Sequence, residues 1–143
     1  MSTEDNKALI RRFVEEGWNQ KNLALFDELN APNFVHHNAL LPDVRSREDH
    51  KQWFTDTRSA FPDFHLTIED MIAEGDKVVT RWTFRGTNMG DIVVPMPLPA
   101  TGKQVTISGI TISRLAGNQV VEDWHQADGL GFMQQLGVIP SQG

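Results

Sequence analysis

The sequence contains no cysteine. This absence excludes disulfides, thiol nucleophiles and thiolate metal sites, and it fits a reducing compartment. The N-terminal residues show no charged segment followed by an apolar one, so no signal peptide is predicted. No apolar run approaches the ~20 residues that a membrane-spanning helix needs. We therefore expect a cytoplasmic protein that does not bind membranes.

Positive charge is also scarce. The chain has 13 lysines and arginines against 19 aspartates and glutamates, which gives a formal net charge of −6. A general nucleic-acid-binding protein would need a basic stripe to neutralise phosphates, so that class is disfavoured. A length of 143 residues predicts a single domain, residues 1–143, that can bury a substantial core.

Several catalytic motifs are missing as well. No serine lies in a nucleophile-elbow motif, and none of the histidines has a metal-ligand spacing such as His-x-x-x-His. The chain also lacks a glycine-rich phosphate-binding loop. We expect the protein to work without a metal or a redox cofactor.

Helical patterns dominate the first part of the chain. Ser2 and Asp5 have capping-box spacing before a helix that ends near residues 19–20, and Asn22 can cap a second, shorter helix. Ser46 and Asp49 form another capping pattern before an amphipathic helix that Pro62 ends. Between these helices, residues 33–38 are predicted to be a short strand.

Extended patterns follow from residue 64 onward. Residues 64–73 and 77–87 predict a hairpin, and residues 103–115 predict a long strand in which Gly109 would permit a bulge or a sharp bend. One more strand precedes a closing helix that begins at Gly129. This order predicts an α+β fold in which helices cover one face of a curved antiparallel sheet.

A long connection, residues 88–101, joins two of these strands. It contains Met89 and Met96 together with several prolines. Long loops inside compact domains are usually functional or mobile. The composition suits an adaptable apolar lip over a pocket, and an ordinary solvent-exposed loop explains it equally well.

The last predicted strand carries an unusual number of ionisable groups. Alternation places Glu122, Trp124, Gln126 and Asp128 on one side, with Asp123 and His125 on the other. A carboxyl group at the end of an apolar strand, next to an indole, can acquire a raised pKa and act as an acid or base. Asp128 is the catalytic candidate on this reasoning. The alternative is that Asp128 only caps the helix beginning at Gly129.

Other candidates come from residues that could face a cavity. An inward-facing His37 could act as a base or donate a hydrogen bond, although it could equally be a satisfied core histidine. Arg81 could bind a carboxylate or carbonyl oxygen, or instead pair with an acid on the neighbouring strand. Trp18 and Trp53 could line a pocket wall, and burial of an aromatic stripe in the core also accounts for them.

Taken together, short motifs along almost the whole chain resemble the SnoaL-like polyketide (ester) cyclase family. The motifs stand in the expected order: NKA (6–8) with RFVEE (12–16), FVHH (34–37), FPDF (61–64), GDKVV (75–79), RW (81–82), RGT (85–87), PATGK (99–103), and VEDW (121–124) with Asp128 and QLG (135–137). No single motif is specific for the family, but the whole series in this order is. Asn88, where many relatives have histidine, and the long proline-rich loop depart from the pattern.

The resemblance implies a cone of the nuclear-transport-factor type, in which N-terminal helices close a curved sheet around an apolar pocket. It implies a cofactor-independent intramolecular aldol cyclisation of a hydrophobic, polyketide-like small molecule, and commonly a homodimer. The family's acid–base aspartate corresponds to Asp128. The positions of His37, Arg81 and Trp124 correspond to family residues that reach the cavity, and Gln126 lies on the same strand face.

Two alternatives remain open at this stage. One is another enzyme of the same fold, an isomerase or an epoxide hydrolase. A hydrolase would need a carboxylate pair to orient water, for which Asp63 and Asp128 are the candidates. The other is a non-catalytic dimer that binds a small ligand, with Asp128 as a helix cap.

Overall fold

The computed structural model describes residues 2–38, 42–92 and 97–140, which form four α-helices, one π-helical segment and five strands. No helix in these ranges is long and apolar enough to cross a membrane. The elements in chain order are α1 (Thr3–Arg12), η1 (Phe13–Trp18), α2 (Leu23–Leu29), β1 (Asn30–Asn38), α3 (Arg47–Ala60), β2 (His65–Glu74), β3 (Lys77–Thr87), β4 (Gln104–Ala116), β5 (Gln119–Ala127) and α4 (Gly129–Leu136).

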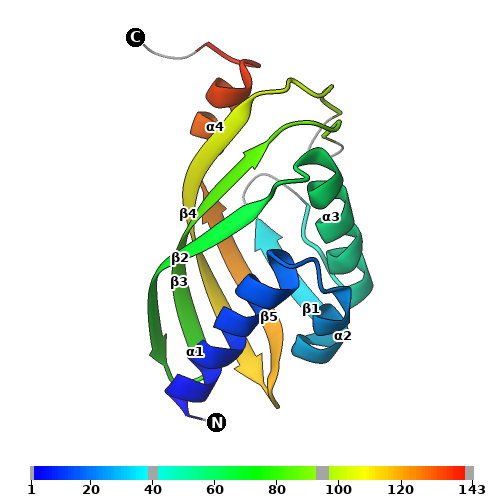
Figure 1. Ribbon diagram of the computed structural model, residues 1–143. Coiled ribbons are helices and arrows are strands. Elements are labelled where there is room, and N and C mark those ends of the chain that lie inside the picture. Colours follow the sequence, from blue (N-terminus) through cyan, green and yellow to red (C-terminus); the bar gives the residue numbers. More distant parts are fainter. Residues whose placement is uncertain (1, 39–41, 93–96, 141–143) are drawn as a thin grey trace.

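One sheet organises the molecule, with the strand order β1-β5-β4-β3-β2. β2, β3, β4 and β5 pair antiparallel to one another, and β1 joins the edge of β5 in parallel. The sheet is strongly curved, and its long strands run the height of the molecule (Figure 1). The predicted antiparallel sheet is therefore confirmed for four strands, and the fifth strand makes the sheet mixed.

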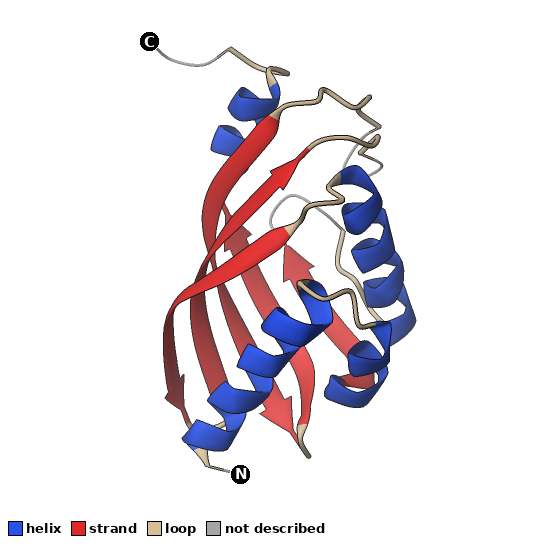
Figure 2. Ribbon diagram, in the orientation of Figure 1, coloured by secondary structure: helices blue, strands red, loops and turns tan. Residues whose placement is uncertain are grey.

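The N-terminal helices lie on one side of this sheet. α1, α2 and α3 cover the concave face, whereas α4 lies beside the N-terminal end of β4, where Gln135 bonds the backbone of Thr106 (Figure 2). The prediction of an α+β fold with helices on one face of a curved sheet is confirmed.

Local signals fix the starts of the helices. Ser2 and Asp5 form the predicted reciprocal capping box, and Asn22 accepts a hydrogen bond from the Ala24 N–H at the start of α2. At α3, the Ser46 hydroxyl accepts from the Asp49 N–H at 3.0 Å. These caps satisfy N–H groups that have no partner within their helix.

The core is largely aromatic. Its main cluster joins η1, α2 and α3 to the concave face of β3, through residues such as Trp18, Phe26, Phe54, Phe64 and Phe84. Trp18 packs edge-on against Phe54 with ring centroids 5.0 Å apart, a favoured geometry for aromatic pairs. This cluster fixes the helices against the sheet.

Gly109 serves close packing and not the predicted bulge. The β3–β4 register runs without interruption through the pair Trp82–Gly109. A β-carbon at position 109 would overlap the Trp82 indole and the Gln126 carbonyl. The missing side chain therefore lets the indole lie flat across β4.

The loop after β3 is anchored from within. The Asn88 side chain is fully buried, accepts from the Thr101 N–H at 2.9 Å and donates to the Gly90 carbonyl at 2.8 Å. Ile92 and Leu98 pair through backbone hydrogen bonds and line a cavity, whereas Met89 is exposed. The part of the predicted apolar lip that includes Met96 lies outside the described residues.

Substituting Gly109 tests this packing. We expect Gly109→Ala to lower the free energy of unfolding by ~1–3 kcal/mol, because the added methyl group must displace Trp82 or separate two paired strands. Urea unfolding measures the difference. Gly17→Ala is the control, since a β-carbon there meets no atom closer than 3.8 Å. Equal effects of the two substitutions would contradict the packing role of Gly109.

Candidate active site

A cavity of about 680 Å³ lies between the concave face of the sheet and the helices. Its wall is mainly apolar and rich in aromatic rings, including Trp18, Trp53, Phe64, Trp82 and Phe84. Polar side chains are few and include His36, His50, Thr111, Asp123 and His125. A largely apolar pocket of this size with a few convergent polar groups is typical of small-molecule sites.

His36 and Asp123 form a pair in the cavity wall. They are register partners in the parallel β1–β5 ladder, and His36 Nδ1 lies 2.5 Å from Asp123 Oδ1. The side chain of His36 is 2% exposed and that of Asp123 is 13% exposed. His36 Nε2 is buried and has no hydrogen-bond partner among the described residues. A hydrogen on Nε2 would lack an acceptor, so the geometry favours the tautomer in which Nδ1–H donates to Asp123.

A second polar chain runs beside this pair. The Trp82 indole N–H donates to Thr111 Oγ1 at 2.9 Å, and Thr111 Oγ1 lies 3.1 Å from His125 Nδ1. The His125 ring stacks on Trp82 with centroids 5.0 Å apart, and its centroid is 5.3 Å from that of His36. Burial, and then the proximity of His36, lower the pKa of His125 to about 3. His125 is therefore a neutral imidazole at physiological pH.

His50 forms a buried polar contact in the cavity wall. Its Nδ1 accepts from the Asn30 side-chain amide at 2.8 Å. Burial is the main reason that the pKa of His50 lies well below its ordinary value, and His36 and His125 lower it further. His50 is neutral as well, so its other ring nitrogen carries the hydrogen.

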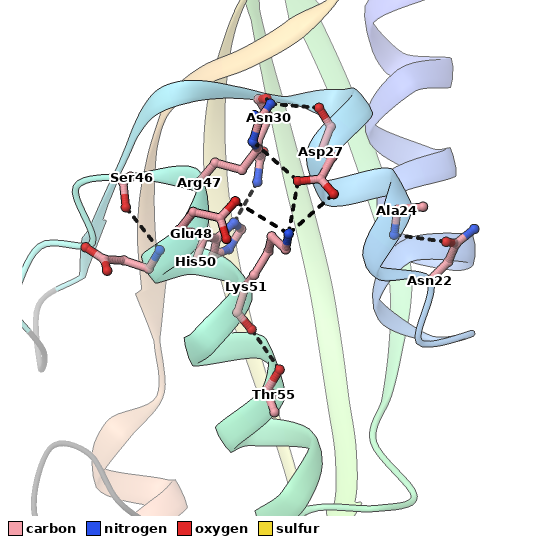
Figure 3. Close-up of polar contacts among 11 residues, drawn as sticks. Asn22, Ala24, Asp27, Asn30, Ser46, Arg47, Glu48, His50, Lys51 and Thr55 are labelled. Atoms are coloured by element: carbon pink, nitrogen blue, oxygen red, sulfur yellow. Dashed lines mark hydrogen bonds and ion pairs between the residues drawn. The ribbon is translucent and has the colours of Figure 1, made fainter.

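A network of surface hydrogen bonds and ion pairs surrounds the Asn30–His50 contact. Lys51 on α3 contacts Asp27 on α2 at 3.0 Å, and Arg47 donates to the Asp27 carbonyl at 2.8 Å and to the Asn30 carbonyl at 3.3 Å. These contacts surround the start of β1, where Asn30 meets His50 (Figure 3). They tie the end of α2 to the start of α3 and so position the strand that carries His36.

Of the eight residues predicted from the sequence, Trp18 and Trp53 line the cavity. Their rings are 5.4 Å apart, and Trp53 also packs 4.8 Å from the His36 ring. The two tryptophans thus form one wall next to the His36–Asp123 pair.

Asp128 lies elsewhere. It is the N-cap of α4, where its Oδ1 accepts from the Gly131 N–H at 2.8 Å, and its side chain is exposed. The helix-cap alternative therefore describes its observed contacts. Asp63 accepts hydrogen bonds from the Thr87 N–H and hydroxyl group, which lower its pKa. Neither carboxylate is part of the cavity wall, so the geometry provides no Asp63–Asp128 pair for orienting water.

The other four predicted residues lie on the convex side of the sheet. Arg81 pairs with Asp70 on the neighbouring strand at 2.7 Å, which is the cross-strand alternative considered for it. His37 lies between Asp43 and Glu122 and stacks on Trp124 with centroids 5.6 Å apart. Gln126 is exposed. None of these side chains lines the cavity.

A bulge separates Val120 from the alternation of the rest of β5. Leu115 pairs with Val120, but the preceding residue Arg114 pairs with Glu122, so Val121 is an extra residue in β5. Val120 faces the cavity, and after the bulge Asp123 and His125 face it too. One inserted residue reverses the faces of a strand. The predicted alternation from Glu122 onward holds, but the cavity lies on the side of Asp123 and His125, so the assignment of Trp124, Gln126 and Asp128 to the pocket side is corrected.

His36 could have been found from its own strand. Phe34 is fully buried, and residues two apart in a strand share a face, so His36 and not His37 is the inward histidine. Thr111 gave no comparable signal, because its importance comes from its contacts with Trp82 and His125.

The contacts of His37 predict a pH-dependent contribution to stability. Its hydrogen bond to Glu122, with a further contribution from Asp43, raises its pKa above the ordinary value of 6.5. Its charged form is therefore favoured by folding. This stabilisation is complete below the unfolded-state pKa and is lost as the pH rises through the folded-state pKa.

We expect His37→Gln to be less stable than the wild type at pH 6, with a smaller difference at pH 9. Urea unfolding midpoints at both values measure this. His65→Gln, at an exposed histidine of β2, is the control and should show little difference at either pH. If His37→Gln lost the same amount of stability at pH 6 and at pH 9, a stabilising interaction of charged His37 with Glu122 and Asp43 would be contradicted.

The chain is similar in sequence and in fold to known proteins. The sequence matches the SnoaL-like polyketide cyclase family over residues 8–136. A solved structure described as a candidate polyketide cyclase, from Acidithiobacillus ferrooxidans, is 31% identical with a TM-score of 0.79, covering 96% of this chain and 99% of that one. AclR, a candidate hydroxylase from Streptomyces galilaeus, is 27% identical with a TM-score of 0.85, covering 99% of this chain and 87% of that one.

A protein from Catenulispora acidiphila with a ketosteroid isomerase-like fold is 18% identical with a TM-score of 0.72, covering 90% of this chain and 92% of that one. This similarity identifies the fold. No curated protein matches the sequence. The family match covers most of the chain, and the protein belongs to the SnoaL-like polyketide cyclase family.

Proposed function

We propose that the protein catalyses acid–base chemistry without a cofactor, closing a ring by intramolecular aldol reaction in a hydrophobic, polyketide-like molecule. The observation that carries the proposal is the Asp123 carboxyl group, which His36 holds at 2.5 Å inside an apolar cavity. Asp123 Oδ2 makes no hydrogen bond to any residue in the described ranges, so this oxygen is the one available to a substrate.

The reaction balances with this one carboxyl group. Asp123 Oδ2 accepts a proton from the carbon next to a substrate carbonyl, and an enolate forms. The enolate carbon then attacks a second carbonyl of the same molecule, forming a C–C bond and an alkoxide. The proton passes from Asp123 to the alkoxide oxygen, which regenerates the carboxylate. No electron acceptor and no second substrate are needed.

His36 has a positioning role in this scheme. Its Nδ1–H holds one oxygen of Asp123, and packing against Trp53 fixes its ring. A carboxylate held in one orientation presents its other oxygen to the cavity with little loss of entropy on reaction.

The shape and lining of the cavity support a bulky apolar substrate. A volume of about 680 Å³ is in the range of pockets that enclose drug-sized molecules, and the aromatic wall suits planar conjugated rings. A conjugated substrate also spreads the negative charge of its enolate, which lowers the demand for a metal ion.

Two aspartate substitutions test the assignment. We expect Asp123→Asn to lower turnover by ~10²–10⁴-fold, because an amide cannot accept the proton. Asp128→Asn should keep turnover, because asparagine and aspartate cap helices about equally well. The assay uses a polycyclic aromatic ketone with a methyl ester and a β-dicarbonyl side chain as the test compound, and chromatography with mass spectrometry measures the cyclised product.

The two variants are matched in chemistry and differ only in position. Thermal unfolding midpoints show whether either variant has lost its fold. Loss of turnover in Asp128→Asn with retention in Asp123→Asn would overturn the proposal and restore Asp128 as the acid–base residue. A second probe, base-catalysed ring opening of 5-nitrobenzisoxazole, reports on a general base without requiring the natural substrate.

We also propose that the protein is a homodimer formed through the convex face of the sheet. Ile72 on β2 and Ile110 on β4 are 67% and 46% exposed, although both are large apolar residues on strands. Light scattering should give twice the chain mass of 16.1 kDa. Ile110→Asp should shift the mass towards the monomer, and a monomeric wild type at micromolar concentration would contradict the proposal.

A further inference from the structure

We propose that His125 is a neutral hydrogen-bond donor that holds the oxygen of the substrate enolate, and that Thr111 and Trp82 fix the tautomer that makes this possible. The inference rests on the proposed acid–base function and adds a second catalytic group to it. In this assignment Asp123 moves the proton, and His125 stabilises the charge that the proton leaves behind.

The direction of the hydrogen bonds starts at Trp82. An indole N–H can only donate, so Thr111 Oγ1 accepts this bond at 2.9 Å. The Thr111 hydroxyl then has its own hydrogen to place, and His125 Nδ1 lies 3.1 Å away. If the hydroxyl donates to Nδ1, both the indole hydrogen and the hydroxyl hydrogen have acceptors. A neutral imidazole that accepts at Nδ1 carries its hydrogen at Nε2.

The surroundings keep the ring neutral and fixed. The face of His125 stacks on Trp82 at an interplanar angle of 20°, His36 approaches from β1, and Trp53 approaches edge-on from α3. Burial lowers the pKa of His125 to about 3, so the ring stays uncharged throughout the physiological range. Asp123, two residues earlier in β5, lines the same cavity.

The spacing of Asp123 and His125 suits a substrate in which the C–H group to be deprotonated lies next to a carbonyl group. Residues two apart on a strand are about 6.6 Å apart along its axis and point to the same side. Asp123 can therefore meet the C–H group while His125 Nε2, on the opposite side of its ring from Thr111, meets the neighbouring carbonyl oxygen. A donor that is already oriented towards developing negative charge lowers the barrier without reorganising during the reaction.

The tautomer can be measured directly in the wild-type protein. Long-range ¹H–¹⁵N correlation spectra distinguish a protonated from an unprotonated ring nitrogen. We expect His125 to show an unprotonated Nδ1 and a protonated Nε2 from pH 5 to pH 8. A hydrogen on Nδ1, or a charged ring at pH 6, would overturn the proposal whatever the activity of the enzyme.

Substitution at Thr111 tests how the tautomer is set. Thr111→Val removes the hydroxyl with little change of shape, and we expect mixed tautomers at His125 and a ~10-fold lower kcat. Thr111→Ser keeps a hydroxyl group at this position and should retain both the single His125 tautomer and the wild-type kcat. Thr83→Val is the control, because the Thr83 hydroxyl bonds Glu69 and does not line the cavity. An unchanged His125 spectrum in Thr111→Val would contradict the role of Thr111.

His125→Leu tests the donor itself. Loss of one preorganised donor to an oxyanion typically costs ~10²–10³-fold in kcat, and we expect this with a much smaller change in KM. Normal kcat in a folded His125→Leu variant would overturn the donor role. This result can be distinguished from a failure of the proposed function. Normal kcat in His125→Leu together with an inactive Asp123→Asn would remove His125 from the mechanism and leave Asp123 as its acid–base residue.

Discussion

The parallel pairing of β1 with β5 is the constraint on which the site depends. β1 stands at the edge of an otherwise antiparallel sheet and places His36 directly opposite Asp123. A carboxyl group in an apolar wall is costly unless a donor meets it, and His36 supplies that donor. The corner formed by Asp27, Arg47 and Asn30 fixes the start of this strand, so a surface network supports the geometry of a buried pair.

The polar groups of the cavity are supported by aromatic packing. Trp53 packs against His36, and Trp82 both stacks on His125 and donates to Thr111. The Trp82 indole can occupy that place only because Gly109 has no side chain. The same rings therefore make the cavity wall apolar and orient hydrogen-bonding groups in it. In such surroundings each polar contact is stronger than it would be in water, and an unpaired one is more costly.

Sequence patterns predicted the elements much better than the faces of the strands. The caps at Ser2 and Asn22 and the bounds of β3 follow from short-range chemistry that sequence displays directly. The site depended on which face of β5 points inward. Alternation separated the two faces of residues 122–128 correctly, but it does not show which of them borders the cavity, because that depends on how the whole sheet curves and packs. Trp18 and Trp53 line the cavity as predicted, although Trp18 lies in η1, where the α-helical periodicity is interrupted.

Alternation within β1 separates two adjacent histidines chemically. His36 faces the cavity, whereas His37 lies outside between Asp43 and Glu122, and its pKa is raised. Inside the cavity, burial lowers the pKa values of His50 and His125 and favours their neutral forms, whereas the contacts of His37 favour its charged form. A change of pH near neutrality can therefore alter the convex side of the sheet without charging the two neutral rings of the cavity. In the proposed mechanism His125 stays uncharged, which is the form that an enolate-stabilising imidazole requires if it is not to lose its proton to the substrate.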